Sequence, residues 1–112
     1  MPVSPLPEEI GPADCAVALA TGGTVLIDCR EPDEHAICRI DGATLLPLGM
    51  WTAAYPAAFP PADQPVIVYC HHGMRSLRAV RFLRQHGHAL ARSLAGGIDA
   101  WTKEIDPSVP RY

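Results

Sequence analysis

Short apolar runs alternate with stretches of helical spacing along this chain. The apolar runs predict strands at residues 24–28, 43–48, 66–69 and 91–94, each bounded by glycine, proline or charged residues. Spacing and composition predict helices at residues 12–21, 34–37, 49–58, 76–86 and 98–104, and residues 6–10 are expected to be extended or to form one turn. Strands and helices alternating through short connections predict an α/β fold, with an open, mainly parallel sheet of about five strands and helices on both faces.

The same spacing predicts which side of each helix faces the core. The expected core-facing side chains are Ala13, Ala16, Val17 and Ala20 in the first helix, Trp51, Ala54 and Tyr55 in the third, and Trp101 in the last. Asp33 is the expected N-cap of the second helix, and Gly87 is the expected C-terminal cap of the helix at 76–86. The prolines near the end of the chain predict an extended tail at residues 106–110.

Length and charge limit the classes of protein to consider. The chain of 112 residues is long enough for one core but not for two, so we expect a single domain over residues 1–112, with its core at about 5–104 and an extended tail at 105–112. The net charge of −3 gives no footprint for nucleic acid or an anionic membrane. No apolar run approaches a membrane span, and residues 1–9 lack the basic and apolar regions of a secretory signal.

The strongest chemical signal lies between the strand at 66–69 and the helix at 76–86. Cys70 opens the connecting loop, Gly73 lies within it, and Arg75 follows two residues later. Loop amides and a helix N-terminus favour an anion at such a position, and they lower a thiol pKa from about 8.5 to between about 3.5 and 7.5. A buried cysteine that only packs is the alternative, but the loop and the helix after it favour a nucleophile.

A second polar segment, Asp28–Arg30, ends the strand at 24–28. Ligands of open parallel sheets bind beyond the carboxyl ends of the strands. Because Cys70 also follows a strand, we expect Cys70 and Asp28–Arg30 to be neighbours at one shared pocket.

Four short motifs follow one another along the chain. They are DCREPDE at residues 28–34, IDGA at 40–43, CHHGMRS at 70–76 and GGIDAW at 96–101. In this order and spacing they resemble the rhodanese-like sulfurtransferase domain, over nearly the whole chain from about Pro5 to Trp101. The match includes that family's active-site loop pattern, C-x-x-G-x-R-S.

The resemblance implies a sulfurtransferase in which the Cys70 thiolate attacks a sulfane sulfur and becomes a persulfide. The donor would be thiosulfate or a small-molecule or protein persulfide, and the acceptor a thiol or another protein. The residues it implies for substrate binding are His71, His72, Gly73, Met74, Arg75, Ser76 and Arg30. Arg75 either attracts an anionic donor or anchors the loop through an acidic neighbour, and Gly73 suits a tight turn of positive φ. We expect no cofactor.

The remaining cysteines depart from the resemblance or leave questions open. The family often carries Gly-His where this chain has Cys38-Arg39, which leaves a spare thiol. Cys38 and Cys29 are expected to pack in the core, and a part in resolving a persulfide would require proximity to Cys70. With Cys15, the four cysteines are too few and scattered for a disulfide scaffold, so we expect reduced thiols and a cytoplasmic location.

Three other functions compete with sulfur transfer. Phosphatases and arsenate reductases of related fold have five residues between cysteine and arginine, whereas four separate Cys70 from Arg75. A docking module is less favoured because non-catalytic relatives commonly lack the cysteine. A metal site is also less favoured, because no CxxC or HxxxH pair appears and His71 and His72 are expected to point in different directions.

Overall fold

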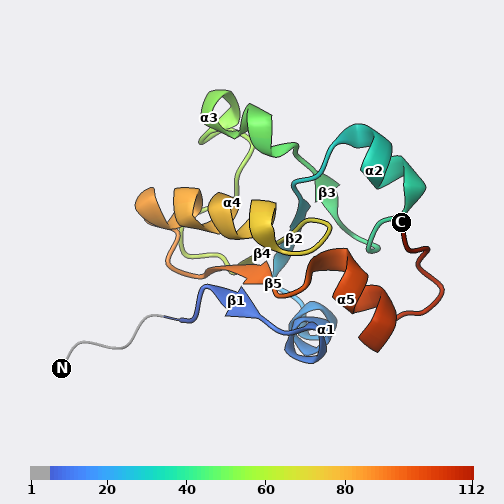
Figure 1. The fold of residues 1–112 in the computed structure, drawn as a ribbon. Helices are drawn as coiled ribbons and strands as arrows, with labels where there is room; N and C mark the ends of the chain where they lie inside the picture. The colour runs from blue at the N-terminus through green and yellow to red at the C-terminus, as the bar shows by residue number, and fades with distance from the viewer. Residues whose placement is uncertain (1–5) are drawn as a thin grey trace.

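The structure, a computed structural model, describes residues 6–112 and contains one five-stranded sheet (Figure 1). The strands are β1 (Glu9–Ile10), β2 (Val25–Asp28), β3 (Thr44–Leu45), β4 (Val66–Tyr69) and β5 (Ala91–Leu94). Their order across the sheet is β1-β5-β4-β2-β3, and every pairing is parallel. The α/β fold class and the parallel sheet of about five strands are therefore confirmed.

Helices cover both faces of this sheet (Figure 1). They are α1 (Pro12–Thr21), α2 (Pro32–Ile37), α3 (Trp51–Ala54), α4 (Met74–Gln85) and α5 (Gly97–Glu104), with a 3₁₀ turn, η1, at Leu48–Met50. One hydrophobic cluster joins α1 and α5 to one face of the sheet, and a second joins α3 and α4 to the other. None of the helices formed by residues 6–112 is long and apolar enough to cross a membrane.

The central strand β4 is the most deeply buried element. Its four residues, Val66–Tyr69, are each at most 1% exposed. β4 pairs with β2 on one side and β5 on the other, and both of its faces are covered, so a continuous apolar run is what the position requires. The loop that follows β4 therefore starts from a rigid base.

The predicted inner face of α1 is wrong for three of its four residues. Ala13, Val17 and Ala20 are exposed, whereas Ala16 packs on the core as expected. The inward side chains include Cys15 and Leu19, four residues apart. Most residues of this helix are apolar, so apolar spacing alone did not distinguish its two sides.

Several element boundaries also differ from expectation. The strand predicted at 43–48 is limited to β3, and the helix predicted at 49–58 is replaced by η1 and the short α3. Tyr55 precedes a proline and is extended, with φ −79° and ψ 137°, as the steric clash with a following proline favours. α2 begins at Pro32 and is capped by Glu31 rather than Asp33, through a reciprocal capping box with Glu34.

The tail at 105–112 is not extended throughout. A turn closed by the Val109 amide on the Asp106 carbonyl, at 3.1 Å, redirects the chain. The C-terminus then returns to α2, as Figure 1 shows. Residues 1–5 lie outside the described residues. The expectations that concern them, the absence of a secretory signal and their place in the domain 1–112, therefore stay predictions.

Candidate active site

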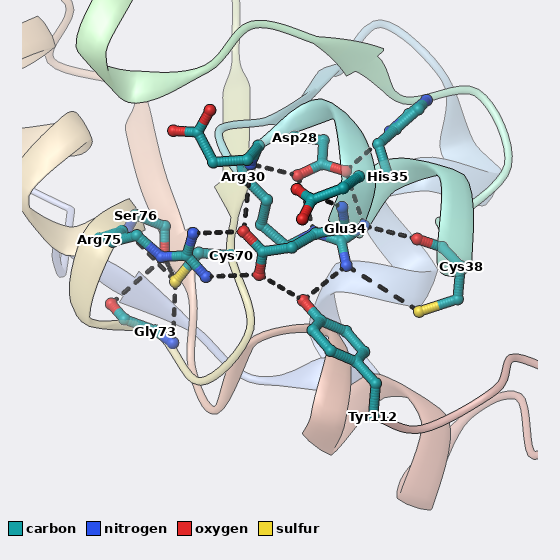
Figure 2. A network of polar contacts seen from close by, with 12 residues as sticks. Asp28, Arg30, Glu34, His35, Cys38, Cys70, Gly73, Arg75, Ser76 and Tyr112 are labelled. Atoms are coloured by element: carbon teal, nitrogen blue, oxygen red, sulfur yellow. Dashed lines mark hydrogen bonds and ion pairs between the residues drawn. The ribbon is translucent and has the colours of Figure 1, made fainter.

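Cys70 lies at the carboxyl end of β4, and three residues separate it from the start of α4. Gly73 makes this short connection possible because its φ of 108° and ψ of −11° are in the left-handed region, as the sequence predicted. The loop curls around the cysteine, and its amides face the sulfur (Figure 2). Cys70 itself is 1% exposed.

Several donors converge on the Cys70 sulfur. The amides of Gly73 and Ser76 donate to Sγ at 3.1 and 3.4 Å, and the Ser76 hydroxyl lies 3.4 Å from it. The pKa of Cys70 is lowered from 9.0 to about 4, chiefly by the neighbouring Cys29 thiol and then by Ser76 and Gly73, against the opposing effect of burial. Cys70 is therefore a thiolate at neutral pH, which is the form that reacts as a nucleophile.

A buried serine pair supports this arrangement. Ser76 Oγ and Ser93 Oγ are 2.7 Å apart, and both residues are fully buried. When Ser93 donates to Ser76, the single hydroxyl proton of Ser76 has two acceptors within reach, the Gly73 carbonyl at 3.2 Å and the Cys70 sulfur at 3.4 Å. Ser93, on β5, was not predicted from the sequence, since a serine within a strand carries no chemical signal by itself.

Helix α5 holds the other side of the loop. The Ile98 amide donates to the Cys70 carbonyl at 2.9 Å, and the Asp99 amide donates to the His71 carbonyl at 3.2 Å. A Cβ on Gly97 would lie 2.6 Å from the Cys70 carbonyl oxygen and still closer to that of His71. The glycine pair of the GGIDAW motif thus allows the close approach of α5 to the loop.

Arg75 anchors the loop through an acidic neighbour. Its two terminal nitrogens bind the two carboxylate oxygens of Glu34 at 2.6 and 2.9 Å. This bidentate pair lowers the pKa of Glu34 to about 2. Of the two roles left open by the sequence, the structure shows anchoring, although the Arg75 side chain remains 35% exposed.

Arg30 does not line the loop surface, which corrects the expectation that it binds substrate. Its side chain has no exposed surface and forms a bidentate ion pair with Asp28 at 2.7 and 2.9 Å. Its remaining donors contact the Cys38 carbonyl, the Cys38 sulfur and the Tyr112 hydroxyl (Figure 2). All five N–H groups are engaged, so Arg30 is a structural residue beneath the site.

Tyr112 connects these two ion pairs and was not anticipated. Its hydroxyl accepts from Arg30 at 2.8 Å and donates to Glu34 at 2.7 Å (Figure 2). Its ring stacks on His71, with 3.9 Å between the ring centroids and 6° between the planes. Proximity between residue 112 and residues 30, 34 and 71 is a property of the tertiary fold alone.

The two loop histidines lie together rather than apart. Their ring centroids are 3.8 Å apart, so the expectation that His71 and His72 point in different directions is wrong. With Asp99 they form a cluster whose ligand atoms all lie within 4.8 Å of one another. Asp99, however, is already paired with Lys103 at 3.1 Å and Arg111 at 3.0 Å. A metal ion would have to displace these two cationic side chains, so we assign no metal here.

Met74, the remaining loop residue expected to bind substrate, points into solvent and is 75% exposed.

Cys29 and Cys38 are both buried, at 1% and 6% exposed, as expected. They differ in their surroundings. Cys38 packs in the cluster on one face of the sheet, whereas Cys29 shares the opposite cluster with Cys70. The structure therefore brings Cys70 together with Cys29, and not with Cys38.

Comparison with known proteins gives the same picture of the fold. A family model described as "Rhodanese-like domain" matches residues 12–104. Among solved structures, the human single-domain sulfurtransferase TSTD1 superposes with a TM-score of 0.80 at 27% identity, covering 88% of this chain and 97% of that one. A rhodanese-related protein from Thermoplasma volcanium gives a TM-score of 0.78 at 28% identity, covering 94% and 99%.

Sequence relatives fall into two kinds. A protein named "Sulfurtransferase" from Allochromatium vinosum is 35% identical over 89 residues, which cover 80% of this chain and 81% of that protein. The probable adenylyltransferase/sulfurtransferase MoeZ of Mycobacterium tuberculosis is 38% identical over 87 residues, which cover 78% of this chain but 22% of MoeZ. This chain therefore matches only about a fifth of the length of that larger relative.

Proposed function

We propose, from the premise that this chain belongs to the rhodanese-like domain family, that it is a sulfurtransferase in which Cys70 carries the transferred sulfur. The observation that carries the proposal is the convergence of the Gly73 and Ser76 amides and the Ser76 hydroxyl on the Cys70 sulfur. These donors stabilise an anion at this point, and both the thiolate and its persulfide are anions.

The first half-reaction loads the sulfur. With thiosulfate as donor, the Cys70 thiolate attacks the outer sulfur, an S–S bond forms, and the S–S bond of thiosulfate breaks to release sulfite. With a persulfide donor, the leaving group is the donor thiolate. In both cases the product is an anionic Cys70 persulfide, whose charge moves outward by one atom within the loop.

The second half-reaction unloads the sulfur onto a nucleophilic acceptor. An acceptor thiolate attacks the outer sulfur of the persulfide and restores the Cys70 thiolate. The low pKa of Cys70 assists this step because a stable thiolate is a good leaving group. We propose a thiol or another protein as acceptor, since a thiolate is the nucleophile that this step requires.

The loop favours sulfur over phosphate as its occupant. Four residues separate Cys70 from Arg75, one fewer than in phosphatase loops of related fold. Arg75 is turned toward Glu34, so its fork is not open to hold an oxyanion in the bidentate manner that phosphate recognition uses. A phosphatase or arsenate reductase is accordingly the weaker candidate. A docking module is also weaker, because docking does not require a cysteine of low pKa.

The mass of the intact protein after incubation with thiosulfate tests this proposal. We expect a gain of about 32 Da that cyanide removes, because cyanide takes the outer sulfur of a persulfide. The Cys70→Ser protein should lack the gain and should transfer no sulfur. Cys15→Ala is the matched control, since Cys15 is buried on the opposite face of the sheet and should load normally.

A sulfur gain that persists in Cys70→Ser would contradict the assignment of Cys70. A folded wild-type protein that gains no mass from thiosulfate, from a small-molecule persulfide or from a protein persulfide would contradict the sulfurtransferase itself. Circular dichroism of each variant separates loss of chemistry from loss of fold.

A further inference from the structure

Cys29 is the direct neighbour of Cys70 on the adjoining strand. β2 and β4 pair in parallel, with Asp28 opposite Tyr69 at the end of the ladder. The Cys29 amide donates to the Tyr69 carbonyl at 3.1 Å, so the ladder continues one step beyond the strands. That step places Cys29 opposite Cys70.

The two side chains also lie on the same face of the sheet. Successive side chains of a strand alternate between faces, and Cys29 and Cys70 share one hydrophobic cluster with Ile27 and Val68, the residues two positions before each. Both cysteines are 1% exposed. Neighbouring strands lie about 4.7–4.9 Å apart, which falls within the Cα separation of about 4.4–6.8 Å that a disulfide spans.

The two sulfurs have unequal chemistry. Cys70 is the reactive thiolate, whereas the pKa of Cys29 is raised well above its usual range, first by the neighbouring Cys70 thiolate and then by burial. The proton therefore lies on Cys29 while Cys70 is an anion. Loss of the negative charge at Cys70 removes the first of these causes, so oxidation of Cys70 makes Cys29 more readily ionised.

We propose that Cys29 is the resolving thiol of Cys70: after a peroxide oxidises Cys70, Cys29 captures it as an intramolecular disulfide. In the first step the Cys70 thiolate attacks hydrogen peroxide, an S–O bond forms and the O–O bond breaks. The products are a Cys70 sulfenic acid and a hydroxide ion. In the second step Cys29 attacks the Cys70 sulfur, the S–S bond forms, and the S–O bond breaks with release of water. A dithiol reductant returns both thiols and is itself oxidised to a disulfide.

The consequence is protection of a site that is otherwise open to irreversible damage. A low-pKa thiolate oxidises readily, and without a resolving thiol the sulfenic acid proceeds to sulfinic and sulfonic acids. The disulfide draws the Cys70 sulfur from the Gly73 and Ser76 amides toward Cys29, which halts the chemistry of the loop until reduction. Cys15 and Cys38 cannot substitute, because both pack in the cluster on the other face of the sheet.

The test is oxidation of the reduced protein with a severalfold molar excess of hydrogen peroxide, because each sulfinic acid consumes two peroxides. Intact mass and peptide mapping follow under denaturing, thiol-blocking conditions. We expect a loss of about 2 Da and no gain of about 32 or about 48 Da, the signatures of sulfinic and sulfonic acid. Trypsin should yield residues 1–30 linked to residues 40–75. Because residues 1–30 also hold Cys15, the same map of Cys15→Ala identifies Cys29 as the partner.

The reactivity of Cys70 toward iodoacetamide provides a readout that does not depend on sulfur transfer. In the wild type and in Cys15→Ala, a dithiol should restore the full alkylation rate after oxidation. In Cys29→Ala and Cys29→Ser the rate recovered after oxidation should be at least about fivefold below the same variant's own rate before oxidation, with sulfinic acid at Cys70. Two results would overturn the proposal. One is oxidised wild-type protein with sulfinic acid at Cys70 and a free Cys29 thiol, and the other is full recovery of the Cys70 alkylation rate in both Cys29 variants.

Discussion

At the scale of single residues, the reactivity of Cys70 depends on how many donors its neighbours aim at one sulfur. The backbone supplies two amides, from Gly73 and Ser76, and side chains supply the Ser76 hydroxyl and the Cys29 thiol. Burial alone would raise the pKa of a thiol, as it does for Cys15, whose pKa rises to about 11. The donors reverse that effect at Cys70, so position in the loop decides whether a buried cysteine is reactive.

The first prediction concerns the pH dependence of Cys70 alkylation. Iodoacetamide reacts with the thiolate, so the wild-type rate should be flat from pH 8 to about 5 and fall as the pH drops through the pKa of about 4. Ser76→Ala removes one donor and should raise that pKa by about 1 unit. At about pH 5 its rate should be about half that of the wild type, with little difference at pH 7. Ser108→Ala, in the exposed tail, is the control, and an unshifted profile for Ser76→Ala would show that the hydroxyl does not contribute.

At the scale of elements, the short helix α2 holds three parts of the chain together. Glu34, in its first turn, binds Arg75 at the start of α4 and Tyr112 at the end of the tail. The pair with Arg75 keeps the pKa of Glu34 at about 2, below its ordinary 4.5. Its contribution to stability is therefore complete above pH 4.5 and is lost as the pH falls through about 2.

The prediction at this scale concerns the tail. Tyr112→Phe removes the hydroxyl that satisfies buried Arg30 and binds Glu34, and an unmet buried donor is costly. We expect the free energy of unfolding, measured by urea titration, to fall by about 1–2 kcal/mol. Arg111→Ala breaks only the exposed ion pair with Asp99 and should cost less than about 0.5 kcal/mol. Equal effects of the two changes would show that the Tyr112 hydroxyl is not part of the structural network.

At the scale of the whole molecule, the site forms where connections from two adjacent strands meet. The loop after β4 and the start of α5 after β5 share hydrogen bonds because β4 and β5 are neighbours in the sheet. Gly97 lies at the point of closest approach, with φ 62°. The geometry around Cys70 thus depends on a residue 27 positions away in the sequence.

The prediction at this scale is a comparison of two glycines. Gly97→Ala would place a Cβ against the carbonyls of Cys70 and His71, so we expect a loss of at least about 2 kcal/mol in the free energy of unfolding and a slower Cys70 alkylation at pH 5. Gly49→Ala meets nothing within 4 Å, has no positive φ, and should be neutral or stabilising by up to about 1 kcal/mol. Thermal or urea unfolding of both variants measures the change in the free energy of unfolding. An unchanged free energy of unfolding in Gly97→Ala would contradict the close approach of α5 to the Cys70 loop.

Much of the fold was predictable because its signals are local. Buried parallel strands such as Val66–Tyr69 appear as apolar runs between turn residues, and the C-x-x-G-x-R-S loop joins the nucleophile to the glycine and the helix that it needs. Boundaries were less accurate where one residue overrides composition. The helix predicted at 49–58 from its alanines ends before Pro56, because the residue before a proline disfavours helical backbone. The capping box of Glu31 and Glu34 places the start of α2 at Pro32, two residues earlier than predicted.

The sequence by itself determined the order of strands and helices, the loop conformation at Gly73 and the identity of Cys70 as the candidate nucleophile, since each depends on residues within a few positions of one another. Only the tertiary structure decided the roles of Cys29, Arg30, Ser93 and Tyr112. Their partners are distant in sequence or are chosen by strand register and by the path of the tail. Burial and pairing, which set a pKa or bury an arginine, arise only when such segments meet.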